Sequence, residues 1–513
     1  DANTTGNYNV AMGYVALGAN TTANANVGIG YASLFDNTTG ANNTAIGFSS
    51  LENNTTAANN TAIGYASLLA NTTGTENVAV GALALDANTT ASYNTAVGLN
   101  SLGANTTGEA NSAVGRSSML LNTTGIQNAA LGVNALYNNT SASNNTAVGY
   151  QSLFANTTGA GNVALGAGSL DANTTADNST AVGYNSLSAN TTGINNTGMG
   201  AFAMITNTTG QSNVAVGYAS LAGNTTASNN TAVGYNSLTA NTTGAQNVAV
   251  GRLALDANTT ANANTAIGNA SMTANTTGAD NTGVGDGSLR NNTTASNNTA
   301  VGKDSLQANT TGTDNVAVGS NALDANTTAS NNTAVGDNAL GANTTGTGNC
   351  ALGADALDAN TTGDSNLALG KSALSSNTTA SLNTAVGVAA MEANTTGANN
   401  VAVGALALDA NTTASYNTAV GQSALTANTT GSNNVAVGEL CLGANTTAGD
   451  NTGVGVSSLR QNTTGTANTA LGRRALHANT TASNNTSVGY FSLAANTTGT
   501  QNTALGGVSL DAN

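Results

Sequence analysis

The fold of this protein is decided by residues 224–240, which read Asn-Thr-Thr-Ala-Ser-Asn-Asn-Thr-Ala-Val-Gly-Tyr-Asn-Ser-Leu-Thr-Ala. The same unit recurs without insertion or deletion, so its opening Asn-Thr pair returns every 17 residues from Asn3 to Asn496. Thirty units fill residues 3–512 of the 513-residue chain. A repeat of fixed length is typical of a stacked architecture, because each unit must match its neighbours in space. We number the positions of the unit 1 to 17, beginning at its first Asn.

Several positions of the unit hardly vary among its copies. Positions 1 and 2 are always Asn and Thr, position 4 is Gly or Ala, position 7 is Asn except for Ser179, and position 11 is always Gly. Position 9 is Ala, Gly or Ser, position 10 is Val, Ile, Leu or Met, and position 15 is Leu or Met. Positions 5, 6, 12, 13 and 16 vary freely. The fixed positions therefore indicate a structural environment that all units share.

The spacing of the apolar positions predicts strands rather than helices. Apolar residues fall at positions 8, 10 and 15 and lack the i, i+3, i+4, i+7 spacing of an amphipathic helix. Positions 7–11 predict a short strand with positions 8 and 10 inward and positions 9 and 11 outward. A second short strand is expected around positions 14–17, with the leucine of position 15 inward. We therefore expect an all-β protein, a parallel β-solenoid (β-roll) of thirty 17-residue coils that spans residues 1–513 as one continuous array.

Residues at equivalent positions of such coils stack into ladders along the solenoid axis. Side-chain amides of stacked Asn residues can hydrogen-bond from coil to coil. The chain contains no proline, which fits because each backbone N–H is needed by a neighbouring coil. The predicted ladder residues of the template unit are Asn224, Thr225, Asn230, Val233, Gly234 and Leu238.

The small residues of positions 9 and 11 predict a close neighbour. Ala232 and Gly234 lie on the strand face that is expected to point outward, where a solvent-facing position would accept larger polar residues. The neighbour is either the opposite side of the same coil or another chain. Two large aliphatic side chains per coil are also a small core for 17 ordered residues. We therefore expect copies of the chain to associate laterally as a homotrimer, with Ala232 and Gly234 on the close-packing face.

A second period of 34 residues runs through the array. Units with Gly at position 4 often carry Val at position 8, as at Gly244 and Val248, whereas units with Ala usually carry Thr, as at Ala227 and Thr231. The alternation slips at Gly125, Gly210 and Gly363. Duplication of a two-unit segment and a structural 34-residue period both explain this pattern.

The stretch Asn-Thr-Ala-Val-Gly-Tyr-Gln-Ser-Leu, from Asn145 to Leu153, closely resembles the head repeats of trimeric autotransporter adhesins (YadA-like proteins). Similar arrays occur in phage tail-fibre-like and other repetitive surface proteins. The resemblance extends over essentially the whole chain through one repeated motif. It implies a left-handed parallel β-roll, three chains about a common axis, and an adhesive or fibre role. The coil is longer than the usual head repeat, and the chain shows no heptad stalk, neck or outer-membrane anchor.

The composition argues against catalysis and nucleic-acid binding. Eight Lys and Arg against 23 Asp and Glu give a net charge of −15, which disfavours nucleic acid. The single histidine, His477, has no candidate partner beside it, and the recurrent Asp of position 16 never falls in adjacent units. No apolar run is long enough to span a membrane. Cys350 and Cys441 are more than five coils apart, so both are expected to be free. We therefore predict no enzyme activity, metal or cofactor.

Two polar features leave alternatives open. Every unit carries an N-glycosylation sequon at position 1, Asn224 in the template, which serves either a glycan or the hydrogen bonds of the corner. Aromatic residues recur at position 12, for example Tyr14, Tyr31 and Tyr235, where they either stack on sugars or shield the end of the strand.

The leading functional prediction is a structural fibre or adhesin shaft, extracellular, on the cell surface or in a virion fibre. The first and last units resemble the others and show no capping features, so we expect a segment of a longer array or subunits that stack end to end as a filament. Its partners would be copies of itself and host or cell-surface glycans. The alternative is a repetitive binding surface, for glycans or for ice, formed by the Thr, Asn and Tyr columns.

Overall fold

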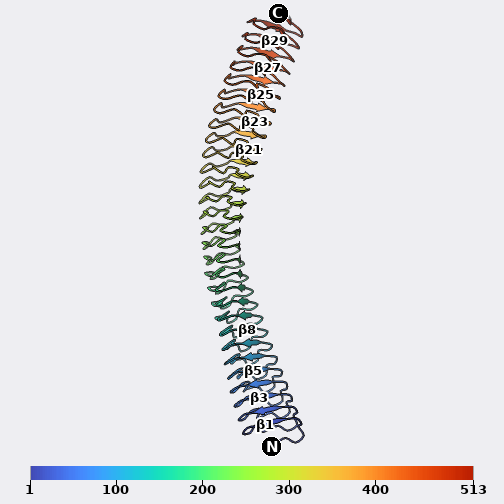
Figure 1. The fold of residues 1–513 in the computed structure, drawn as a ribbon, viewed down its shortest axis with the longest axis vertical. Coiled ribbons are helices and arrows are strands. Elements are labelled where there is room, and N and C mark those ends of the chain that lie inside the picture. Colours follow the sequence, from blue (N-terminus) through green and yellow to red (C-terminus); the bar gives the residue numbers. More distant parts are fainter. Residues whose placement is uncertain (1, 512–513) are drawn as a thin grey trace. The chain divides into compact units, whose positions relative to one another are not determined.

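The computed structural model describes residues 2–511, which form two compact units that meet between residues 260 and 261 in the sequence. Each unit is a parallel β-solenoid with a 17-residue coil, and residues 2–511 contain no helix. Within each unit the short strands stack one above the next (Figure 1). The expected all-β class and parallel solenoid architecture are confirmed.

The first unit contains fifteen three-residue strands, each formed by positions 8–10 of its coil. Consecutive strands pair in parallel without any shift in register, as Thr231, Ala232 and Val233 do with Val248, Ala249 and Val250. The strands are β1 (Val10–Met12), β2 (Val27–Ile29), β3 (Thr44–Ile46), β4 (Thr61–Ile63), β5 (Val78–Val80), β6 (Thr95–Val97), β7 (Ser112–Val114), β8 (Ala129–Leu131), β9 (Thr146–Val148), β10 (Val163–Leu165), β11 (Thr180–Val182), β12 (Thr197–Met199), β13 (Val214–Val216), β14 (Thr231–Val233) and β15 (Val248–Val250).

The second unit repeats this arrangement in fifteen further strands. Here too the neighbours pair in parallel and in register, for example Val401 opposite Thr418. The strands are β16 (Thr265–Ile267), β17 (Thr282–Val284), β18 (Thr299–Val301), β19 (Val316–Val318), β20 (Thr333–Val335), β21 (Cys350–Leu352), β22 (Leu367–Leu369), β23 (Thr384–Val386), β24 (Val401–Val403), β25 (Thr418–Val420), β26 (Val435–Val437), β27 (Thr452–Val454), β28 (Thr469–Leu471), β29 (Thr486–Val488) and β30 (Thr503–Leu505).

The sequence predicts a second short strand at positions 14–17, and this prediction is wrong. These positions form a continuous turn, because positions 13 and 15 adopt left-handed backbone conformations, as at Asn236 (φ 51°) and Leu238 (φ 53°). A left-handed residue cannot belong to an extended strand. Leu238 nevertheless points inward and is fully buried, as expected.

Hydrogen bonds between coils continue outside the strands. Leu238 N donates to Ala254 O at 2.9 Å, and Thr225 N donates to Thr242 O at 3.1 Å. The Thr225 hydroxyl donates to the same Thr242 oxygen at 3.1 Å. The turns and corners of each coil, like the strands, are therefore hydrogen-bonded to the next coil. This explains how coils with three-residue strands can form a continuous stack.

The strand faces the opposite way from the sequence-based expectation. Ala232 is fully buried, whereas its neighbours Thr231 and Val233 lie on the outer face and are half-buried. The interior of a coil thus contains the alanines of positions 4 and 9, the Ser or Ala of position 14, the leucine of position 15 and the Asn residues of positions 1 and 7. Val233 is an outward ladder residue and not a core residue.

The size limit at position 9 comes from the opposite side of the solenoid. A Cβ built on Gly28 would lie 3.1 Å from Leu17 Cγ and 3.2 Å from Ser33 Oγ. The leucine column therefore leaves room at position 9 for only a methyl group or a hydroxymethyl group. The assignment of Ala232 to a face packed against another chain is thus wrong, because Ala232 faces the interior of its own solenoid, whereas Gly234 is half-buried.

Glycine is required at position 11 by both conformation and space. Gly421 has a φ of +135°, a region that residues with a Cβ rarely occupy. A Cβ at this position would lie 2.6 Å from the carbonyl carbon of Gly438 in the next coil. Gly234 has the same conformation, with a φ of +137°. The glycine column therefore marks a close backbone approach within one stack.

The alternation of Gly and Ala at position 4 has a structural correlate. A Cβ at Gly312 would overlap the Ala329 carbonyl oxygen and lie 2.6 Å from Asn309 Oδ1. In the Gly210 coil Thr209 N donates to Thr225 O at 3.3 Å, a bond that is not observed for Thr226 in the following Ala coil. Where two Gly coils follow each other, as at the three slips, both carry the bond. Three Ala coils also carry the bond, from Thr22, Thr175 and Thr413, at the longer distances of 3.4–3.5 Å. The bond is thus more regular in Gly coils, and it follows the residue at position 4 rather than a fixed 34-residue register.

Candidate binding surfaces

The Asn residues of positions 1 and 7 form two buried amide ladders. Asn224 Nδ2 donates to Asn207 Oδ1 at 2.7 Å and to Ala227 O at 3.0 Å, and the Asn224 side chain is fully buried. At position 7, Asn230 N donates to Asn213 Oδ1 at 3.0 Å. Both columns satisfy backbone groups at the corners of the coil, so they belong to the interior and offer no surface to a partner.

The position of Asn224 has a consequence for its glycosylation sequon. A glycan replaces one of the two Nδ2 hydrogens, so it would remove at least one of the bonds to Asn207 and Ala227, and it would need a path out of the fully buried position. Displacing the Asn224 amide from the ladder would leave Asn207 Oδ1 without this buried donor. We expect the chain secreted from a glycosylating host to show, by intact mass spectrometry, the mass of the polypeptide alone. Heterogeneous added mass that a glycosidase removes would contradict this result.

The most extensive surface feature is an aliphatic column on the outer face of the strands, which we call the aliphatic stripe. It consists of the residues of position 10 together with those of position 8, which are Thr in seventeen units and mostly Val in the others, so the stripe is continuously aliphatic along position 10. Although position 10 points outward, it is Val, Ile, Leu or Met in all thirty units. Exposed fractions of 36–51% are found at Ile63, Val114, Leu131, Leu165, Met199, Ile267, Val301, Leu352, Leu369, Val403, Val454 and Leu471. Contiguous apolar surface of this kind is typical of an interaction site.

Aromatic rings of position 12 stack on one another at the end of the strands. The ring centroids of Tyr14 and Tyr31 are 5.4 Å apart, and those of Tyr31 and Phe48 are 4.9 Å apart, with nearly parallel planes. Tyr218 and Tyr235 stack in the same way at 5.5 Å. Because each ring covers the face of the next, the stacks present mainly ring edges. This arrangement favours shielding of the strand ends over stacking on sugars, which uses a free ring face.

The two threonine columns differ in what they offer to solvent. The Thr225 hydroxyl of position 2 donates to Thr242 O, whereas Thr226 of position 3 is exposed. Both belong to a bend and not to a flat strand. The two columns therefore supply one regular row of free hydroxyl groups. The ice-binding alternative would use two such rows.

The two cysteines occupy different environments, and both are free. Cys441, at position 14, is fully buried, and this burial raises the pKa of its thiol to about 12. Cys350 is half-buried at position 8 of β21, within the aliphatic stripe. The chain thus carries one thiol on the stripe and one in the interior.

The titratable groups of residues 2–511 are scattered along the coils. His477 Nδ1 lies 3.1 Å from the backbone oxygen of Ser457. Burial raises the pKa of the position 16 carboxyls Asp86, Asp324 and Asp358, and hydrogen bonds from backbone N–H groups oppose the shift. Among residues 2–511, no three His, Cys, Asp or Glu side chains converge as metal ligands.

The described part of the chain has no helix of the length and apolarity needed to cross a membrane. Comparison with protein-family models and with curated proteins finds no match for this chain.

Proposed function

We propose that this protein is a non-enzymatic extracellular structural fibre or adhesin shaft whose copies associate laterally as a homotrimer through the aliphatic stripe. In this role the protein provides length and stiffness, which its regular coils determine. The observation that carries the proposal is that position 10 stays aliphatic in every unit although its side chain lies on the outer face.

Three properties of the coil support self-association. The interior contains only one large aliphatic side chain per coil, the leucine or methionine of position 15, so a single solenoid buries little apolar surface. The stripe repeats with the coil, so two copies of the chain match each other along their whole lengths. Few charges interrupt it, since charged residues make up 6% of the chain. A second copy is therefore the partner that fits the stripe best.

The mass of the protein in solution tests this proposal. Light scattering should give three times the chain mass of 49.5 kDa, and the same mass after dilution, because a continuous apolar interface dissociates little. A mass equal to one chain would overturn the self-association. A mass of two chains would keep the stripe as an interface and refute the trimer that the family resemblance implies.

A further inference from the structure

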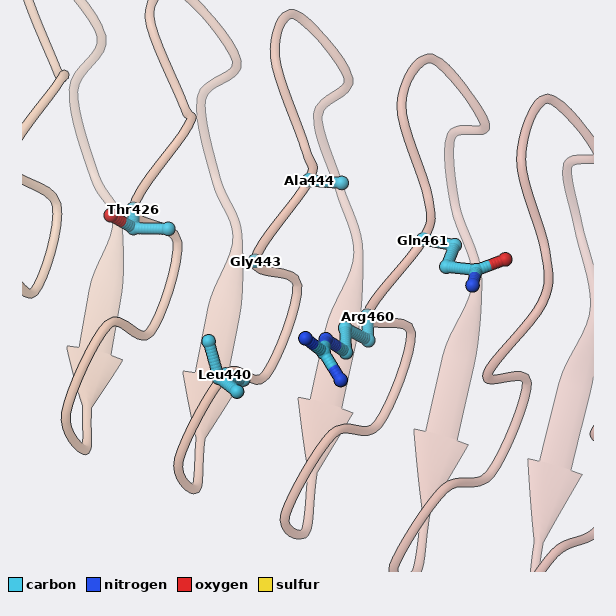
Figure 2. Close-up of a pocket in the computed structure, with 6 residues that line it drawn as sticks. All are labelled: Thr426, Leu440, Gly443, Ala444, Arg460 and Gln461. Atoms are coloured by element: carbon cyan, nitrogen blue, oxygen red, sulfur yellow. The ribbon is translucent and has the colours of Figure 1, made fainter.

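The surface formed by positions 13, 16 and 17 carries a notch in the second unit. Side chains of position 16 make a column there, with Thr426, Gly443 and Arg460 in three successive coils. Gly443 has no side chain, so the column is interrupted between Thr426 and Arg460. Figure 2 shows these residues on the segments that return past the strands, with the Arg460 side chain beside the interruption.

Other glycines of position 16 are covered by side chains, but Gly443 is not. A Cβ on Gly18 would touch the Phe35 ring, and one on Gly103 would lie 3.1 Å from Leu120 Cδ1. At Gly341 the Asp324 carboxylate is 3.6 Å away. At Gly443 the nearest three atoms all belong to the backbone of Leu440 in its own coil, the closest at 3.3 Å. The notch is therefore open to a ligand.

The notch has a cavity volume of about 450 Å³ and both polar and apolar walls. Its lining residues are Thr426, Leu440, Gly443, Ala444, Arg460 and Gln461 (Figure 2). The volume lies within the range of small-molecule sites. Backbone groups of the floor are engaged, since Ala444 N donates to Arg460 O at 2.9 Å. The side chains therefore provide the free hydrogen-bonding capacity.

Arg460 is a free cation in an otherwise acidic protein. Its guanidinium makes no ion pair or hydrogen bond with any residue of the described range 2–511, where the one ion pair joins Lys303 and Asp304. The next coil adds Arg474, whose guanidinium lies 5.4 Å from the centre of the Phe491 ring, and His477. Arg460 is the one charged side chain among the residues that line the notch, and the Asp409 carboxylate next to the notch is engaged by the Thr426 hydroxyl. The notch therefore favours an anion that reaches the Arg460 guanidinium.

The polar walls suit a ligand that carries hydroxyl groups. The Thr426 hydroxyl donates to Asp409 Oδ1 at 2.6 Å, so it can accept a hydrogen bond from a ligand hydroxyl. The Gln461 side-chain amide is exposed and can both donate and accept. Leu440 offers an apolar wall for C–H groups. Carboxylate, hydroxyl and C–H groups occur together in acidic sugars.

We propose that the Gly443 notch binds an acidic sugar unit, with Arg460 holding its carboxylate in a bidentate pair. A guanidinium matches the planar carboxylate in charge and geometry. Gln461 and Thr426 bind the ring hydroxyls, and Leu440 packs against the C–H groups of the ring. This is a discrete ligand site in one stretch of the second unit, and it goes beyond the structural role of the repeats.

Titration of the full chain with glucuronate, followed by ligand-observed NMR, tests the site. We expect saturable millimolar binding, which Arg460→Gln weakens about 10- to 100-fold because a charged hydrogen-bonded pair is lost. Gly443→Leu should abolish binding by filling the notch. The matched control Arg290→Gln removes an arginine from the same position of another coil and should bind like the wild type. Circular dichroism of all variants should match the wild type.

Two comparison ligands separate the possible sources of affinity. Glucose lacks the carboxylate and should bind more weakly than glucuronate by at least the factor lost in Arg460→Gln. Sulfate provides an oxyanion without a sugar and should bind more weakly than glucuronate. Equal affinity for sulfate would overturn the sugar assignment, and unchanged glucuronate binding in both Arg460→Gln and Gly443→Leu would overturn the site.

Discussion

Gly421→Ala is expected to open the stack between β25 and β26. The new Cβ would lie 2.6 Å from the Gly438 carbonyl carbon, and it would force an alanine into a backbone conformation with a φ of +135°. Relief requires the two coils to separate, since the contact is with backbone and not with a flexible side chain. We expect a local loss of about 3 kcal/mol, or more than about a hundredfold in the opening equilibrium.

Hydrogen exchange measures this effect where it arises. Amide protection should fall in β25 and β26 and remain unchanged several coils away, because each coil contacts only its neighbours. Gly341→Ala is the matched control, since its Cβ would meet nothing closer than 3.3 Å and position 16 is Ala in other coils. Equal protection in the two variants would show that the close approach at position 11 is not required.

Asn230→Ala is expected to remove a junction between two coils. Asn230 Oδ1 accepts from Asn247 N at 2.9 Å, and Asn230 Nδ2 donates to Gly244 O at 2.9 Å. Alanine would take the Oδ1 acceptor away from Asn247 N, whereas Gly244 O would keep the bond from Asn241 Nδ2 at 2.9 Å. A buried unsatisfied group costs about 1–3 kcal/mol, so we expect the stability of this segment to fall by about 2–4 kcal/mol, including the cavity that the amide leaves.

Two other substitutions serve as comparisons for the stability loss of Asn230→Ala. The chain itself uses serine once at position 7, where Asn196 N reaches Ser179 Oγ at 3.4 Å, so Asn230→Ser should cost less than Asn230→Ala. Asn229→Ala changes the exposed neighbour and should cost about 1 kcal/mol, because alanine tolerates the left-handed backbone of position 6 (φ 62° at Asn229) less well than asparagine but occupies it elsewhere, as at Ala467. The measurement is exchange of the Asn247 amide proton. Similar exchange in all three variants would contradict the proposed role of the amide ladder.

The sequence was sufficient to predict the repeat, the parallel stack and the inward leucine. The fixed spacing from Asn3 to Asn496 permits only a stacked structure, and the exclusion of proline indicates that hydrogen bonds run throughout the coil. The turn over positions 12–17 was not predictable in the same way. Asn236 is a residue type that tolerates a left-handed conformation, but Leu238 gives no such signal.

The prediction of which strand face points inward was wrong because both faces carry apolar residues. Thr231 and Val233 alternate with Ala232 and Gly234, so a period of two identifies two faces without saying which is inside. The larger hydrophobic residues of positions 8 and 10 suggest the inner face, but the room available inside the coil determines which face points inward. Position 9 accepts only Ala, Gly or Ser because the leucine column lies behind it. Position 10 accepts four apolar side chains of different shape. This tolerance indicates that the side chain of position 10 is less confined than that of position 9.

Because the alanine face of the strand points inward, the expected contact between copies moves from the alanine column to the aliphatic stripe. It also changes the meaning of the two cysteines. Cys350 lies within the stripe, whereas Cys441 lies in the interior with a thiol whose pKa is raised to about 12. A thiol with so high a pKa has almost no reactive thiolate at neutral pH. Crosslinking at neutral pH therefore reports on Cys350 alone.

The most direct test of the central claim is crosslinking of the native protein with a short bismaleimide. If the stripe lies between copies in register, Cys350 of one chain faces Cys350 of another, and the reagent should join them into covalent dimers. Cys441 should react only after denaturation. Complete modification of Cys350 without any crosslinked product, at a protein concentration where copies are associated, would show that the copies are not in contact through the stripe in register.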